Sequence, residues 1–262
     1  MDAIEKVSFG YAKHIKLGVG IRKGAEVQFH PITRHAIDKR SLGIALLVEE
    51  HNLDWSGDDP HSSSNAEAVA LAIMVFEELN RLAGTGQTLT DSEVSDRLLT
   101  AYERANSWAK TSTITASLLT VILIDHVVYV ASVGACRSYL IRDGNLSQIS
   151  VDDYARMDID GEIQVASNSL SNVIGMGTVD SLTEIHFNRY QTHSEDLLLL
   201  CSGAFHQTVS EDEMLRAASL SKNPSILCAS LAGMATQRLD PLHALALCVL
   251  SVKSAENRAL SP

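Results

Sequence analysis

The chain has 262 residues, of which 45% are hydrophobic, and its 32 acidic and 21 basic residues give a net charge of −11. This length suits one large domain, and the hydrophobic content can fill its core without disulfides or metals. The acidic balance excludes a nucleic-acid partner, because no basic excess is available to release counterions from a phosphate backbone. We therefore expect a single domain over residues 1–262, with a flexible polar tail at 254–262.

The cysteines indicate the chemical environment of the chain. The four are Cys136, Cys201, Cys228 and Cys248. They are widely spaced within apolar segments, which is typical of buried free thiols and not of a zinc site or disulfides. The sequence has no signal peptide and no apolar run of membrane-spanning length. We therefore expect a cytoplasmic protein without a membrane partner.

Strands are predicted where short apolar runs lie between turn signals. The predicted segments are 41–50, 113–124, 127–133, 137–142, 145–150, 196–201 and 243–252. Asp143-Gly144 favours a tight hairpin, because both central residues of a type I′ turn need positive φ. The stretch 51–65 is rich in Asp, Ser, Gly and Pro and is predicted to be a loop.

Four helices are predicted from capping signals. Capping boxes occur at 64–67, 90–93 and 210–213, and Pro224 suits the first position of a fourth helix. The predicted apolar faces are Val69, Ile73, Phe76 and Ala83; Val94, Leu98, Ala101, Ala105 and Trp108; and Leu227, Leu231 and Met234. The order of strand, helix pair, strands, helix pair and strand predicts an α+β fold with helices layered on antiparallel sheets.

Three local patterns do not indicate a function by themselves. Gly18, Gly20 and Gly24 lack the spacing of a dinucleotide-binding loop. The loop with His51, Asp54, Asp58, Asp59 and His61 has metal-ligand residue types, but its spacing fits neither an EF-hand nor a zinc site. Ser202 follows an apolar strand, but its Cys-Ser-Gly context is not a nucleophile elbow. We interpret the three as turn glycines, a solvated loop and a turn serine.

Motifs spread over residues 7–253 occur in a family-specific order. Residues 129–144, YVASVGACRSYLIRDG, resemble a strand ending in V-G-D-S-R followed by A-Y-L and a D-G hairpin, and residues 195–205, EDLLLLCSGAF, resemble G-D-L-L-L-L-C-S-D-G-L. Weaker matches are 36–39 with N-E-D-A, 43–50 with a strand ending in D-G-M-G-G, 65–70 with A-G-E-x-A-S, 111–113 with G-T-T and 240–243 with D-N-I-T. In this order the motifs resemble the protein phosphatase 2C family, and the compact length is similar to that of bacterial members.

The resemblance implies a fold and a chemistry. The fold is a four-layer α-β-β-α sandwich, with two antiparallel sheets flanked by helix pairs. In the family, carboxylates hold two Mn²⁺ or Mg²⁺ ions in a cleft, and a bridging water attacks phosphoserine or phosphothreonine. An arginine near the N-terminus binds the phosphate.

The positions that hold the metals in the family are largely changed in this chain. Carboxylates remain at Asp38, Glu49 and Asp240, and the changed positions are Ile37, Glu50, Ala135 and Gly203. Thr33 stands at the position of the phosphate-binding arginine, with Arg34 beside it. The longer side chain of Glu49 displaces its carboxylate, and three carboxylates are few to balance two dications.

Two functional hypotheses follow from these changes. In the first, the chain has no catalytic residues and no expected cofactor, and is a pseudophosphatase. It then acts as a binding or regulatory module in serine/threonine phosphorylation signalling, with a kinase, a phosphoprotein or another signalling protein as partner. In the second, it is a weakly active Mn- or Mg-dependent phosphatase, with His51, Asp54 and Asp58 as replacement ligands. A cleft that binds a small ligand is a third possibility, and no residue pattern identifies such a ligand.

Overall fold

Two antiparallel β-sheets form the centre of the computed structural model, which describes residues 11–12, 15–22, 25–33, 41–51, 66–84, 89–124, 126–159, 162–177, 184–239 and 245–252. Sheet I contains β1 (Tyr11–Ala12), β2 (Ile15–Arg22), β7 (Arg137–Arg142), β8 (Asn145–Gln148), β12 (Leu197–Cys201) and β13 (Leu245–Val252). Sheet II contains β3 (Ala25–Thr33), β4 (Ser41–His51), β5 (Thr115–Ile124), β6 (Val127–Val133) and β11 (His186–Gln191). The strand orders are β1-β2-β13-β12-β7-β8 and β11-β6-β5-β4-β3.

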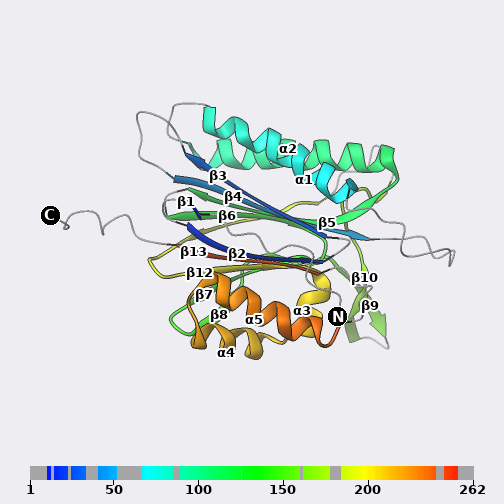
Figure 1. Cartoon of the computed structure of the whole chain (residues 1–262). Helices are drawn as coiled ribbons and strands as arrows, with labels where there is room; N and C mark the ends of the chain where they lie inside the picture. The colour runs from blue at the N-terminus through cyan, green and yellow to red at the C-terminus, as the bar shows by residue number, and fades with distance from the viewer. Residues whose placement is uncertain are drawn as a thin grey trace.

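Helices cover the outer face of each sheet (Figure 1). Sheet II is covered by α1 (Ala66–Asn80), the short 3₁₀ turn η1 (Arg81–Gly84) and α2 (Asp91–Ser112). Sheet I is covered by α3 (Gly203–Thr208), α4 (Glu211–Leu220) and α5 (Pro224–Thr236). The resulting layers are helices, sheet II, sheet I and helices, which confirms the α-β-β-α sandwich expected from the sequence. None of the described helices is long and apolar enough to cross a lipid bilayer.

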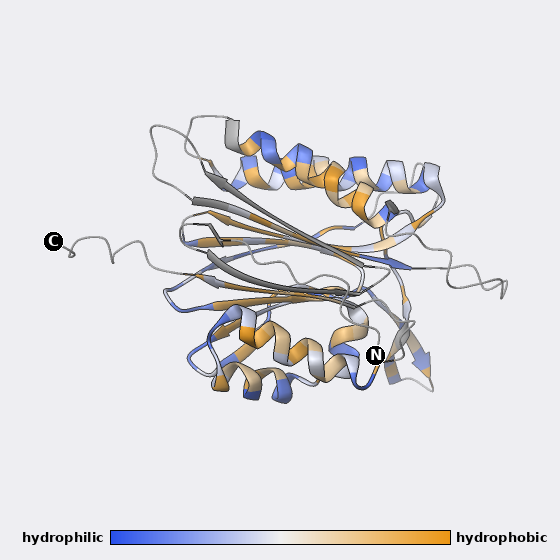
Figure 2. Cartoon of the chain, viewed as in Figure 1, coloured by the Kyte–Doolittle hydropathy of each residue, from blue (hydrophilic) through white to orange (hydrophobic). Residues whose placement is uncertain are grey.

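Three hydrophobic layers hold the sandwich together, and Figure 2 shows the hydrophobic residues concentrated along the strands and the inner sides of the helices. Because side chains alternate along a strand, neighbouring residues enter different layers. Leu46 packs under α1 and α2, whereas Leu47 packs between the two sheets with Leu198. Leu199, next to Leu198, faces α3–α5 with Phe205. All four cysteines are free and buried, as predicted.

The capping predictions for α2, α4 and α5 are confirmed. Thr90 and Ser210 form complete capping boxes, and Pro224 is the first residue of α5. The Asp143-Gly144 turn has φ values of 50° and 76°, so both residues have the positive φ that the hairpin requires.

The predicted apolar face of α1 is wrong at Ile73, whereas Phe76 packs against the core as predicted. Ile73 is 44% exposed, and the buried face consists of Ala68, Leu71, Ala72, Val75 and Leu79. Residues 68–76 are all apolar, so more than one stripe has helical spacing, and only packing against sheet II selects between them. The start of the next strand is also corrected, because α2 extends to Ser112 and Thr113 caps it in the left-handed conformation with φ 57°.

A buried carboxylate lies between the two helices that cover sheet II. The Glu78 side chain in α1 is 1% exposed and pairs with Arg97 and Arg104 of α2 at 2.8 and 2.5 Å and with Arg81 at 2.9 Å. Burial would raise the pKa of Glu78, but the three guanidinium groups hold it below its ordinary value. This network therefore ties α1 to α2 through one neutralised carboxylate.

A ribbon of two strands lies outside both sheets. It consists of β9 (Tyr154–Ile159) and β10 (Glu162–Leu170), paired antiparallel from Ile159 opposite Glu162 to Ala155 opposite Ala166. The ribbon lies at the same end of the sandwich as α3 (Figure 1). At its base, Tyr154 Oη contacts His206 Nε2 of α3 at 3.5 Å. This ribbon was not predicted, although the sequence has Asp160-Gly161 between two short alternating segments, the same hairpin signal as Asp143-Gly144.

Candidate functional site

The candidate cleft lies where β4 and β12 end and the turn between β6 and β7 meets α3. Glu49 is near the end of β4, Ala135 is in the turn and Gly203 is the first residue of α3. The structure therefore brings together three of the positions that the sequence resemblance places at the metal cleft. Asp38, Asp240, Ile37 and Arg34 lie outside the described residues.

The Glu49 carboxylate is bound to the N-terminus of α3. It is 5% exposed, and its Oε2 accepts a hydrogen bond of 2.7 Å from the backbone N–H of Gly203. Its Oε1 accepts a longer one of 3.4 Å from the N–H of Ala204. The Sγ of Cys136 lies 3.7 Å from Oε2 as a weak donor. Glu49 thus caps α3 in place of Ser202, whose hydroxyl makes no capping bond and instead accepts from the N–H of Ala246.

Gly203 leaves the space that the Glu49 carboxylate fills. A Cβ built on Gly203 would lie 3.1 Å from Glu49 Oε2 and 3.4 Å from the Cβ of Ala135. The contact with Glu49 Oε2 is tight, so a larger residue at 203 would compete with the carboxylate for this place. The long side chain at 49, the small one of Ala135 and the absence of a side chain at Gly203 are therefore matched to one another.

Glu50 points to the other side of the strand. Ile44, Leu46 and Val48 face α1 and α2, and Glu50 continues this alternation. Its Oε2 is buried and has no hydrogen-bond partner among the described residues. Burial, and secondarily the nearby Glu67, raise the pKa of Glu50 to about 7. Glu50 therefore does not share the space of Glu49, although the two are adjacent in sequence.

Polar residues next to the cleft fix the turn between β6 and β7. The Oγ of Ser117 accepts from the N–H of Ala135 at 2.9 Å and is hydrogen-bonded to His51 Nε2 at 2.6 Å. Burial lowers the pKa of His51. Gly134 has φ 93°, and a Cβ there would lie 2.2 Å from Ser117 Oγ, so only glycine fits this close approach. His51 thus supports the turn, whereas Asp54, Asp58, Asp59 and His61 lie outside the described residues.

Two further side chains, Arg137 and His206, lie beside the cleft, and both are already hydrogen-bonded within the protein. Arg137 makes three hydrogen bonds to the Asp152 carboxylate and one of 2.9 Å to Tyr139 Oη. Burial lowers the pKa of Arg137, but these bonds outweigh it and keep the pKa above its usual value. His206 donates from Nε2 to the carbonyl of Ala135 at 2.9 Å, and burial lowers its pKa.

Sequence reasoning missed Ser117, Cys136 and His206 as neighbours of the cleft. Ser117 lies on the neighbouring strand directly opposite Glu49, and His206 lies one helical turn after Gly203. Strand pairing and helix spacing could have suggested both, once the register was known. The contact of Cys136 with Glu49 spans 87 residues and has no local signal.

The described residues of the cleft do not fit a two-metal centre. Ala135 and Gly203 have no side-chain oxygen, and both oxygens of Glu49 point at backbone N–H groups. A hard dication needs several oxygen ligands in a near-octahedral arrangement. Within the described ranges, no three His, Cys, Asp or Glu side chains lie close enough together to hold a metal.

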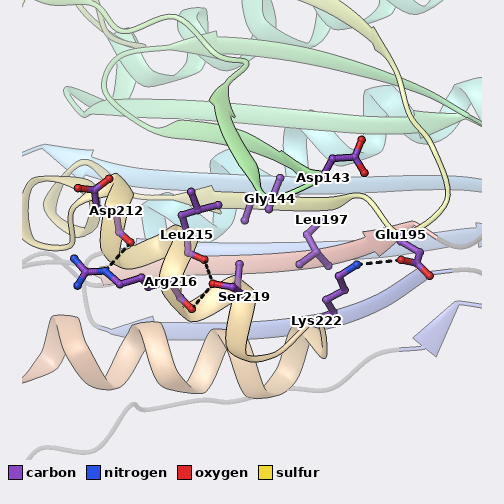
Figure 3. A pocket seen from close by; sticks show the side chains of 11 residues that line it. Asp143, Gly144, Glu195, Leu197, Asp212, Leu215, Arg216, Ser219 and Lys222 are labelled. Atoms are coloured by element: carbon purple, nitrogen blue, oxygen red, sulfur yellow. Dashed lines mark hydrogen bonds and ion pairs between the residues drawn. The ribbon is translucent and has the colours of Figure 1, made fainter.

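A separate cavity lies at the opposite end of β7 and β12. It has a volume of about 570 Å³ and is lined by Ile141, Leu197, Leu215 and Ala218 among other residues. Figure 3 shows its rim, where Lys222 pairs with Glu195 at 3.0 Å and Ser219 donates to backbone carbonyls of α4. None of the predicted site residues that the structure describes (Glu49, Glu50, Ala135 and Gly203) lines it, so it is distinct from the cleft.

Comparison with known proteins supports the fold. No family model and no curated protein matches the chain. Among solved structures, the S. agalactiae serine/threonine phosphatase matches with a TM-score of 0.70 at 13% identity, covering 92% of this chain and 100% of that chain. The Mycobacterium tuberculosis serine/threonine phosphatase PstP/Ppp matches with a TM-score of 0.61 at 15% identity, covering 88% and 99%. The catalytic domain of PstP in complex with two manganese ions gives 0.61 at 14% identity, covering 88% and 99%.

At sequence identities this low, the structural matches establish the fold and leave the activity open. The matches nevertheless span most of this chain and nearly all of each neighbour, so the two-sheet sandwich as a whole is shared. The chain therefore has the fold of the bacterial serine/threonine phosphatases, as its resemblance to the protein phosphatase 2C family implied.

Proposed function

We propose that this chain is a catalytically inactive phosphatase-like protein, which acts as a binding or regulatory module in serine/threonine phosphorylation signalling. The observation that carries the proposal is the hydrogen bond of 2.7 Å from Gly203 N–H to Glu49 Oε2. The resemblance assigns a metal-binding aspartate to both of these positions. In this chain they bind each other.

The free energy needed to bind metal ions in this cleft supports the proposal that the chain is inactive. A cation at Glu49 has to compete with two backbone donors of α3, and N–H groups cannot be ligands themselves. Two dications in one cleft repel each other and need several carboxylates to offset that repulsion. Ala135 and Gly203 provide none.

The loss of ligands leaves the scaffold intact, which supports a binding role. Glu49, Ala135 and Gly203 pack closely, and the sandwich around them has three filled hydrophobic layers. A protein with this fold can therefore present a phosphatase-like surface without hydrolysing phosphate. A kinase or a phosphoprotein is the kind of partner that such a surface suits.

Metal binding and turnover test the absence of catalysis. We expect calorimetric titration of the full chain with Mn²⁺ to give no micromolar binding, and p-nitrophenyl phosphate to show no manganese-dependent turnover. Micromolar binding together with manganese-dependent turnover would instead support the weakly active phosphatase. Both measurements are needed, because a bound metal without turnover still leaves the protein inactive.

Restoring the carboxylates tests whether the changed residues of the cleft are the reason for the expected lack of metal binding. We expect the double variant Glu49→Asp/Gly203→Asp to bind Mn²⁺ more tightly than the wild type. Gly233→Asp is the matched control for added charge, since a Cβ at Gly233 has open space around it. If the wild type binds Mn²⁺ as tightly as the double variant, the explanation based on Gly203 fails.

Capture from the native cell tests the binding role. We expect the immobilised chain to retain a kinase or a phosphoprotein, and phosphatase treatment of the lysate to abolish retention of a phosphoprotein partner. Retention of proteins unconnected with phosphorylation would contradict the signalling role, even if the chain is inactive.

A further inference from the structure

The β9–β10 ribbon exposes large apolar side chains. Met157 is 50% exposed, Ile159 44%, Ile163 72% and Val165 61%. They lie on both faces of the ribbon, because residues directly opposite each other share a face and Met157 is opposite Gln164, whereas Val165 is opposite Arg156. A two-stranded ribbon standing alone is marginally stable in water, so these side chains indicate that another surface covers the ribbon.

The outer edge of β9 is open in the described part of the chain. β10 pairs with one edge, and no further described strand joins the ribbon. Among the described residues, no backbone hydrogen bond from outside the ribbon reaches residues 155–159. An open edge of exposed strand residues is a template for pairing with another strand.

The sequence of β9 is complementary to itself. It contains Arg156, Met157 and Asp158 in succession, all exposed. If two copies of β9 pair antiparallel about a twofold axis at Met157, each Arg156 lies directly opposite the partner's Asp158. We propose that this edge is a homodimer interface, in which the two β9 strands join two ribbons into one four-stranded sheet.

Both faces of the resulting sheet are compatible with this pairing. On one face Met157 lies opposite the partner's Met157, and Ala155 lies opposite the partner's Ile159, so apolar residues meet. On the other face, Ile163 and Val165 of β10 flank the two ion pairs, because they are paired with Asp158 and Arg156 within each ribbon. Opposite charges and apolar residues in direct cross-strand pairs both stabilise a sheet.

Other registers lack this complementarity. A shift by two residues in one direction places Arg156 opposite itself, and a shift in the other direction places Asp158 opposite itself. Like charges directly opposite each other are destabilising. The edge of β10 can pair about Gln164, which places Ile163 opposite the partner's Val165 but forms no ion pair. Charge complementarity therefore selects the β9 edge and one register.

Charge reversal tests the interface in solution. We expect the wild type to sediment as a dimer, and Arg156→Asp or Asp158→Arg to raise the dimer dissociation constant about tenfold or more, since each creates two repulsive pairs. The double variant Arg156→Asp/Asp158→Arg restores the complementarity and should return the dissociation constant to near the wild-type value. Arg216→Asp, an exposed arginine of α4, is the matched control and should have no effect. Circular dichroism of each variant checks that the fold is retained.

Cross-linking tests the register. Residues directly opposite in an antiparallel pair have Cα atoms about 4.5–5.5 Å apart, which a disulfide can bridge. We expect Met157→Cys to form a covalent dimer on mild oxidation and Gln164→Cys to stay monomeric on denaturing gels, while the four native cysteines are buried. A wild type that remains monomeric at about 100 µM, a concentration at which a dimer of micromolar affinity would form, overturns the proposal. So does a dimer that cross-links through Gln164→Cys and not through Met157→Cys.

Discussion

Glu78 between α1 and α2 and Glu49 in the cleft are both buried carboxylates, but the protein satisfies them in different ways. Glu78 is surrounded by three arginines, at 2.5 to 2.9 Å. Glu49 accepts hydrogen bonds from the backbone N–H groups of Gly203 and Ala204, and no cation pairs with it within the described residues. The charge is therefore neutralised at Glu78 and only solvated by dipoles at Glu49.

The difference distinguishes two ways in which a protein can bury a carboxylate. An arginine-paired carboxylate has its charge balanced and joins two helices. A carboxylate held by N–H donors at a helix N-terminus interacts favourably with the positive end of the helix dipole, and its geometry is set by the backbone. Glu49 has the second environment, at a position that the sequence resemblance assigns to metal binding.

The largest expected effect is at Glu78. Glu78→Ala leaves three arginines facing a space without a counter-charge, and we expect the free energy of unfolding to fall by about 2–3 kcal/mol. This is less than for a fully buried pair, because the arginine side chains are 40–59% exposed. Urea denaturation measures the loss, and an unchanged midpoint would show that the network adds nothing.

The stabilisation that the Glu78 network contributes depends on pH, and the direction of the pKa shift fixes the sign of that dependence. The folded-state pKa of Glu78 lies below the ordinary value of 4.5, so its contribution is present above pH 4.5 and is lost as the pH falls through the lowered value. Glu78→Gln cannot titrate and should lack this part of the acid sensitivity. Equal acid sensitivity in the two proteins would contradict the assignment.

A smaller loss is expected at Glu49. Glu49→Ala leaves two backbone donors of α3 without their acceptor, and we expect the free energy of unfolding to fall by about 1–3 kcal/mol. Glu49→Gln keeps one carbonyl oxygen that can accept from the Gly203 N–H, so its loss should be smaller. If Glu49→Ala is as stable as the wild type, the carboxylate does not cap α3 and the contrast with Glu78 disappears.

Replacing Glu50 should raise the free energy of unfolding. Its pKa of about 7 means that the folded state holds a proton that the unfolded state releases, so stability falls as the pH rises from 4.5 to 7. Glu50→Gln removes this penalty. We expect a gain of about 1 kcal/mol at pH 8 and none at pH 4, a modest value because the side chain is partly exposed. Thermal unfolding at both pH values measures it, and an equal effect at both would exclude titration as the cause.

The smallest effect is expected for an ion pair in water. Lys222 and Glu195 pair at 3.0 Å, but their side chains are 70% and 74% exposed. Lys222→Ala should therefore change the free energy of unfolding by less than about 0.5 kcal/mol. A loss comparable to that at Glu78 would mean that burial does not decide the strength of these carboxylate interactions.

The sequence was most informative where local signals and packing agree. The central strands and the Asp143-Gly144 hairpin were predicted because apolar runs and a positive-φ turn specify them without tertiary information. The ribbon was not predicted, although Ala155–Ile159 alternates apolar and polar residues, because this short segment with two charges is not an apolar run of the kind that marked the other strands. The apolar face of α1 was wrong at Ile73 because a continuous apolar run offers several equivalent faces.

The candidate site was predicted in part. The resemblance selected Glu49, Ala135 and Gly203, which the structure brings together. The hydrogen bond between Glu49 and Gly203 joins residues 154 positions apart. It depends on the length of one side chain and the absence of another, and no pattern of spacing contains that information.

The position of β13 in sheet I affects the order in which the two sheets can fold during translation. β13 is the last described strand in sequence, yet it lies between β2 and β12 inside sheet I. During synthesis, sheet II can assemble once β11 has left the ribosome, whereas sheet I waits for residues 245–252. Until then β12 exposes an unpaired, entirely apolar edge of Leu-Leu-Leu-Leu-Cys, the kind of segment that chaperones protect. Nascent chains stopped before residue 245 should therefore be more prone to aggregate than the finished protein.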